Sequence, residues 1–234
     1  IWRSSQHSTK LHITKPLGQV LREYRRNQIE TPSFIPEPCI YTAIRDPISH
    51  FLSGYNEFEW RLLESKQKII PPQYDMIVPY SPDNPERHRD RFRSLVETLL
   101  LRDPKLAGGQ SMHFYPMSRV LKVLEQFNFK LDAYIPQLTN LTETLPAMMS
   151  STCKNFLSPE SIPPLHLGGF HKTSGDPLGL YKAAKDVWKE SGPTARALCL
   201  ILAFDYACFE DLPDGIPELC RSVYEEYADE IIEI

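Results

Sequence analysis

The segment from Cys39 to Leu62 constrains the fold most, because its hydrophobic pattern changes period within a few residues. The run CIYTAI, from Cys39 to Ile44, is apolar and rich in β-branched and aromatic side chains, which predicts a short buried strand. A helix is predicted to begin at Pro47 with Asp46 as its N-cap, because proline suits the first helical position and aspartate accepts first-turn amide hydrogens. The apolar face of this helix consists of Ile48, Phe51, Leu52, Tyr55, Phe58 and Leu62. A strand that runs directly into a helix is typical of α/β proteins with a parallel sheet.

The rest of the chain extends this pattern. Further helices are predicted over Leu17–Asn27, Pro85–Leu101 with Asn84 or Asp83 as cap, Met117–Phe127 and Thr194–Phe209, and a second strand within Asp132–Leu138. With 41% hydrophobic and 24% charged residues, the 234-residue chain can bury one substantial core. We therefore predict an α/β fold in a single domain covering residues 1–234.

Composition narrows the possible partners and the compartment. The chain has 26 basic and 30 acidic residues, which argues against nucleic acid as a partner held by bulk electrostatics. The five cysteines show neither CxxC nor Cys/His spacing, so no metal site is predicted. They are either buried thiols or pairs, and Cys208 and Cys220 flank a turn-forming segment that a disulfide could close in an oxidising compartment. The acceptor sequence Asn140-Leu141-Thr142 fits a secretory location.

No apolar run approaches the length of a membrane span; the longest candidate is Ala197–Phe204. The chain begins at Ile1 rather than at methionine, and we expect it to be truncated at its N-terminus.

Arg45 marks a candidate anion site. In α/β sheets, ligands bind beyond the carboxyl ends of strands, where a helix N-terminus offers amide hydrogens and a positive dipole end. Arg45 adds a bidentate donor for phosphate oxygens, and Ser53, on the polar side of the helix, could donate its hydroxyl. In the alternative interpretation, Arg45 pairs with Asp46 or a neighbouring carboxylate, and Ser53 faces water.

The complete string YTAIRDPISHFLSGYNEF resembles the 3′-phosphate-binding segment of the Golgi carbohydrate sulfotransferases. The matching residues are Arg45, Asp46, Pro47, Ser53 and Tyr55. Three later segments resemble the same family in the same order: QSMHFYPMSRVL with its His113 and Pro116, DAYIPQLTNLTETLPAMM, and LILAFDYACFEDLPDGIPELC with its Asp-Tyr-x-x-Phe element. The resemblance covers residues 39–220.

The resemblance implies a P-loop-like parallel sheet flanked by helices, of the sulfotransferase type. It also implies transfer of a sulfuryl group from 3′-phosphoadenosine 5′-phosphosulfate, the co-substrate, to a carbohydrate hydroxyl, without a metal. Arg45 and Ser53 would hold the donor's 3′-phosphate. His113 is the candidate general base, with a structural or donor-positioning role as its alternative. Lys172 and Thr173, in the loop HLGGFHKTSG, would contact phosphate.

Two departures from the family open an alternative. The family's 5′-phosphosulfate loop has one candidate here, RSSQHSTK, which lacks glycine and lies about forty residues before Arg45. The residues it offers to the donor are Arg3, Ser4, Ser5, Ser8 and Thr9. Thr139 stands where the family has glutamate. The alternative is therefore a non-catalytic sulfotransferase-fold protein that binds nucleotide or glycan. A P-loop kinase is disfavoured because GxxxxGK[ST] does not occur.

The resemblance also implies a glycan acceptor and a location in the Golgi lumen, with anchoring by an N-terminal membrane segment outside this chain. The helix Pro85–Leu101 carries Arg89, Arg91 and Arg93, which together with Arg25 and Arg26 could line a groove for an acidic glycan. Alternatively, these arginines form a solvated face that Glu86 and its acidic neighbours neutralise.

Overall fold

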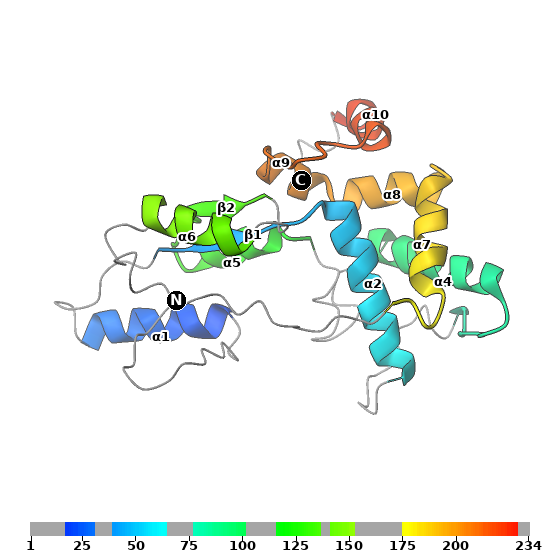
Figure 1. Ribbon diagram of the computed structural model, residues 1–234, viewed down its shortest axis with the longest axis horizontal. Coiled ribbons are helices and arrows are strands. Elements are labelled where there is room, and N and C mark those ends of the chain that lie inside the picture. Colours follow the sequence, from blue (N-terminus) through cyan, green and yellow to red (C-terminus); the bar gives the residue numbers. More distant parts are fainter. Residues whose placement is uncertain are drawn as a thin grey trace. The chain divides into compact units, whose positions relative to one another are not determined.

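The computed structural model describes residues 17–30, 39–64, 77–101, 116–136, 141–152 and 175–228. The chain divides into two compact units (Figure 1). Unit 1 comprises residues 1–44 and 118–167, and unit 2 comprises residues 45–117 and 168–234. The single domain expected for residues 1–234 stays a prediction. No helix in the described ranges is long and apolar enough to cross a membrane.

Unit 1 contains the parallel strand pair. Its elements are α1 (Leu17–Glu30), β1 (Tyr41–Ala43), α5 (Arg119–Gln126), β2 (Ala133–Ile135) and α6 (Leu141–Thr152). β1 and β2 lie side by side (Figure 1). They pair in parallel, with Tyr41 opposite Ala133. The Ile44 amide, which donates to the Ile135 carbonyl at 2.9 Å, continues the pairing. A strand therefore exists within Cys39–Ile44, but the expectation that it is buried is wrong, because none of its three residues is buried. Its parallel pairing agrees with an α/β class, although the described residues are mostly helical.

Unit 1 packs α1 against the segment that follows α5. Leu21 and Tyr24 of α1 are buried. The Tyr24 and Phe129 rings lie edge to face with centroids 5.5 Å apart. The Arg25 guanidinium lies over the Phe129 ring and donates to the Phe127 carbonyl, so Arg25 has a structural role.

The regular elements in the described part of unit 2 are all helices. Its elements are α2 (Pro47–Glu64), α4 (Pro85–Leu101), α7 (Leu180–Lys189), α8 (Pro193–Ile201), α9 (Ala203–Cys208) and α10 (Glu218–Glu226). α4 packs against α7 and α8, and α7 also packs against α2. The helix predicted over Thr194–Phe209 is divided at Leu202, whose φ of −100° and ψ of 7° depart from helical values.

The predicted apolar face of α2 forms part of the unit 2 core. Its residues Ile48, Phe51, Leu52, Tyr55 and Phe58 are buried, whereas Leu62 is half-buried. Phe92 of α4 meets this face, with its ring centroid 5.0 Å from that of Tyr55. The 3.6-residue pattern in the sequence thus predicted which side of α2 turns inward.

Both predicted N-caps are confirmed. Asp46 Oδ1 accepts a hydrogen bond from the Ser49 amide at 2.7 Å at the start of α2. Asn84 Oδ1 accepts one from the Arg87 amide at 3.1 Å at the start of α4. Each side chain satisfies an amide that would otherwise have no partner within its helix.

The expected Cys208–Cys220 disulfide is wrong. Cys220 is bonded to Cys199, and Cys208 is an exposed free thiol. α8 packs against α10, which brings the Cα atoms of Cys199 and Cys220 to 5.0 Å. Tertiary packing of these two helices, rather than the nearby turn, therefore selected the partner of Cys220. Cys39, in unit 1, is also disulfide-bonded.

Candidate functional site

Arg45 precedes α2 and presents an available cation. Its side chain is exposed and has no hydrogen bond or ion pair with another described residue. Its backbone amide donates to Met117 Sδ at 3.5 Å, which fixes the backbone rather than the guanidinium. The alternative in which Arg45 pairs with Asp46 is therefore not what the structure shows.

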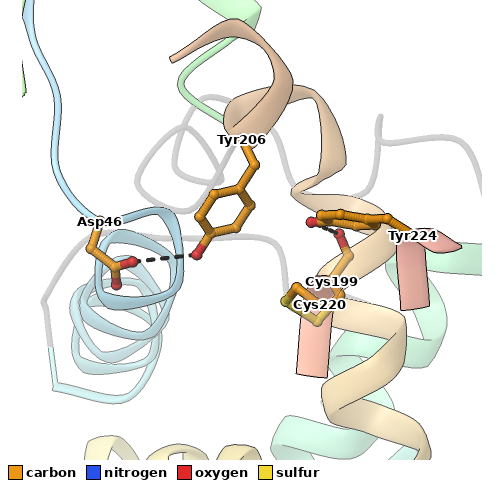
Figure 2. The surroundings of a disulfide bond; sticks show 5 residues. All are labelled: Asp46, Cys199, Tyr206, Cys220 and Tyr224. Carbon is orange, nitrogen blue, oxygen red and sulfur yellow. Dashed lines mark hydrogen bonds between the residues drawn. A yellow bond between two sulfur atoms is a disulfide. The ribbon is translucent and has the colours of Figure 1, made fainter. Parts of the chain in front are cut away.

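Asp46 is held on both carboxylate oxygens. Oδ1 caps α2, and Oδ2 accepts a hydrogen bond from the Tyr206 hydroxyl at 3.3 Å (Figure 2). Burial, followed by the charge of Asp46, raises the pKa of Tyr206, so the phenol stays protonated and continues to donate. Because the Asp46 charge already lies against the N-terminus of α2, an anion bound there would be attracted mainly by Arg45 rather than by the helix dipole.

Asp205, the residue before Tyr206, holds a second segment beside Arg45. Its carboxylate is fully buried, and Oδ2 accepts a hydrogen bond from the Met117 amide at 2.9 Å. The sulfur of Met117 in turn accepts the hydrogen bond from the Arg45 amide. Two consecutive residues of α9 therefore reach the two segments that form this site.

Three of the four segments that resemble the sulfotransferases meet here. They contribute Arg45 with Asp46, Met117, and Asp205 with Tyr206. The remaining segment supplies β2 in unit 1. Sequence reasoning identified these segments but not the bonds that join them, because Asp46 and Tyr206 are 160 residues apart in the chain.

Ser53 lies on the polar side of α2, as predicted. It is half-buried between residues Leu52 and Gly54, which are buried, and its hydroxyl has no hydrogen bond with another described residue. Ser53 follows Pro47 by six residues, about 9 Å along the helix axis. An anion that contacts both Ser53 and Arg45 would therefore require the arginine side chain to extend along the helix.

The other predicted site residues lie outside the described residues. They are Arg3, Ser4, Ser5, Ser8, Thr9, His113, Lys172 and Thr173, together with Thr139. Of the seven histidines, His50 and His88 fall in the described ranges. His88 is buried, stacks on the Tyr80 ring with centroids 5.2 Å apart, and places Nε2 2.8 Å from the Ser81 carbonyl oxygen. Its environment is that of a structural histidine.

The arginines of α4 separate into two groups. Arg93 donates to Glu86 at 2.9 Å and to Glu190 at 3.0 Å. The hydrogen bond to Glu86 is the main reason that the pKa of Glu86 is lowered. Arg89 pairs with the same two glutamates, at 3.3 and 3.8 Å. These carboxylates offset the positive charges of Arg89 and Arg93, as the solvated-face interpretation expects.

Arg91 differs from its neighbours because it is completely buried. Its Nη2 lies 2.7 Å from Glu59 Oε2, and its Nη1 donates to the Val78 carbonyl at 2.7 Å. The expectation that Arg91 lies on a surface groove is therefore wrong. Glu59, four residues after Tyr55, falls on the apolar face of α2, and that position was the available signal for a buried charge pair.

Comparisons with protein-family models, with curated proteins and with solved structures found no match to this chain. The described residues contain no group of three or more histidine, cysteine or acidic side chains arranged to hold a metal ion.

Proposed function

We propose that this chain is a carbohydrate sulfotransferase with the P-loop-like α/β fold of that class. The observation that carries the proposal is the meeting of three separated, sulfotransferase-like segments around an available arginine. Arg45 has no competing anion among the described residues, and its backbone is tied to Met117. An exposed cation on a fixed backbone, with no anion paired to it among the described residues, suits a phosphate ligand.

In the proposed reaction, an acceptor hydroxyl oxygen attacks the sulfur of 3′-phosphoadenosine 5′-phosphosulfate. A new sulfur–oxygen bond forms, the bond between sulfur and the 5′-phosphate oxygen breaks, and a general base takes the hydroxyl proton. The products are a sulfate ester and 3′-phosphoadenosine 5′-phosphate. The protein's contribution is to position both reactants and to stabilise the charge on the leaving phosphate.

The remaining roles follow from the sequence. Arg45 and Ser53 bind the donor's 3′-phosphate, and His113 is the candidate base. Two further groups contact the donor: Arg3, Ser4, Ser5, Ser8 and Thr9 at the 5′-phosphosulfate, and Lys172 with Thr173 in the later loop. The acceptor is a glycan, with acidic glycans included.

The cysteine chemistry supports a location in an oxidising compartment. Cys199 and Cys220 form a disulfide, and Cys39 is bonded as well. Disulfides of this structural kind persist in the secretory pathway and are rare in the cytosol. This agrees with the proposed Golgi lumen.

The first experiment measures, by calorimetry, binding of the product 3′-phosphoadenosine 5′-phosphate, which is adenosine 3′,5′-bisphosphate. Arg45→Ala should weaken binding about 10- to 100-fold, because it removes a charge-assisted hydrogen bond to phosphate. Ser53→Ala should weaken it about 2- to 10-fold, because it removes a neutral donor. Arg221→Ala is the matched control, because Arg221 is also exposed in unit 2 but lies on α10.

The second experiment measures sulfate transfer from labelled donor to a panel of neutral and acidic glycans. Transfer that Arg45→Ala abolishes and Arg221→Ala retains would support the proposal. Bisphosphate binding without transfer to any glycan would favour the non-catalytic alternative. A folded chain that binds neither the bisphosphate nor any glycan of the panel would refute both functions.

A further inference from the structure

Tyr206 connects the candidate site to the disulfide. Its side chain is only 3% exposed, and its hydroxyl donates to Asp46 (Figure 2). Its ring centroid lies 6.4 Å from that of Tyr224. The Tyr224 hydroxyl donates to the carbonyl of Cys199 at 2.8 Å, and Cys199 is bonded to Cys220.

α10 is fixed to α8 by two interactions on one face. Cys220 and Tyr224 are four residues apart on α10, so their side chains lie on the same side of that helix. Cys220 bonds covalently to Cys199 of α8, and Tyr224 bonds to the carbonyl of the same residue. The position of the Tyr224 ring therefore depends on the disulfide.

α9, which carries Tyr206, has six residues. A helix this short has little stability of its own, so its orientation depends on what packs around it. Tyr224 is one of those neighbours. An α10 that separates from α8 would remove one side of the Tyr206 packing and loosen the hydrogen bond to Asp46.

We propose that Tyr206 is a positioning residue for the donor site, and that the Cys199–Cys220 disulfide keeps it in place. Tyr206 acts through Asp46, which caps α2 next to Arg45. Donor affinity therefore depends on a disulfide that does not itself contact the donor. The affinity part of this inference rests on the proposed function, whereas the effect on α2 does not.

The test begins with Tyr206→Phe, which keeps the ring and removes the hydroxyl. Asp46 retains its bond to the Ser49 amide, so the loss is partial, and we expect the dissociation constant of adenosine 3′,5′-bisphosphate to rise about three- to tenfold. Tyr224→Phe is the matched control, because it also removes one hydroxyl. It leaves an aromatic ring beside Tyr206, and it leaves the hydrogen bond from Tyr206 to Asp46 intact. It should raise the dissociation constant less than twofold.

A mutant cycle separates positioning from general destabilisation. The double variant Cys199→Ala/Cys220→Ala, made with Cys208→Ser to remove the free thiol, is compared with Cys208→Ser alone. If the disulfide acts through Tyr206, adding Tyr206→Phe to the double variant causes no further loss of affinity. If the two changes act independently, their fold-losses multiply, and the link between disulfide and Tyr206 is refuted.

Hydrogen exchange at the start of α2 is read in parallel. The Ser49 amide donates a hydrogen bond to Asp46. Tyr206→Phe should accelerate hydrogen exchange at this amide, whereas Tyr224→Phe should not. Unchanged Ser49 exchange and unchanged bisphosphate affinity in Tyr206→Phe would overturn the proposal, even if the disulfide variants do not fold. Wild-type protein that does not bind bisphosphate refutes the proposed function, and Ser49 exchange then decides the positioning role by itself.

Discussion

The buried pair Arg91–Glu59 offers the strongest stability prediction. Both side chains are 0% exposed, and the guanidinium also donates to the Val78 carbonyl. Arg91→Met removes the cation and leaves the Glu59 carboxylate in an apolar interior. Breaking a buried pair in this way costs about 3–5 kcal/mol, a large part of the 5–15 kcal/mol by which a typical domain is stable.

Removing both charges should cost much less than removing one. Glu59→Leu alone leaves Arg91 charged and buried, and we expect the same cost of about 3–5 kcal/mol. The double variant Glu59→Leu/Arg91→Met leaves no uncompensated charge, and we expect it within about 1 kcal/mol of wild type because buried pairs are often replaceable by apolar residues of similar volume.

Urea unfolding followed by tryptophan fluorescence measures these differences. Trp60 of α2 and Trp188 of α7, two of the three tryptophans, lie in unit 2, so most of the signal reports on the unit that contains the pair. Single variants that lose less than about 1 kcal/mol, or a double variant that loses the sum of the two, would refute the reasoning.

Three further predictions test other parts of unit 2. Replacing Cys199 and Cys220 by alanine should lower the free energy of unfolding by about 3 kcal/mol, from the loop entropy of a 21-residue separation; a loss below 1 kcal/mol would contradict this. Asn84→Ala should cost about 1 kcal/mol through loss of the α4 cap, with an unchanged urea midpoint as the contrary result. Burial raises the pKa of Tyr55 and of Tyr206, so folding favours their neutral forms. The stability they contribute is therefore complete below about pH 10 and is lost above it. The part of the phenolate absorbance that comes from Tyr55 and Tyr206 should then rise together with unfolding, and ionisation of all eleven tyrosines near pH 10 in folded protein would show this to be wrong.

The parts of the fold that depend on neighbouring residues were predictable. Asp46 and Asn84 each precede a proline that begins a helix, and both cap their helices as expected, because capping joins residues only three positions apart. The apolar face of α2 was predictable for the same reason, since the period of the helix places its residues on one side.

The parts that depend on distant residues were not predictable. Cys220 has two possible partners within about twenty residues, and only the packing of α8 on α10 selects Cys199. Arg91 has the same local context as Arg89 and Arg93, yet it is buried because Glu59 lies on the facing helix. No local pattern distinguishes an arginine that will meet a buried carboxylate from one that will remain in water.

The same division applies to the candidate site. The sequence by itself determined that Arg45 follows a strand and precedes a capped helix, because these are short-range properties of the backbone. Only the tertiary structure decided that Tyr206 and Asp205 reach that segment, because their contacts arise when α9 packs beside residues more than eighty positions away. Local propensities place charged groups along the chain, whereas burial and distance after folding determine which groups they meet.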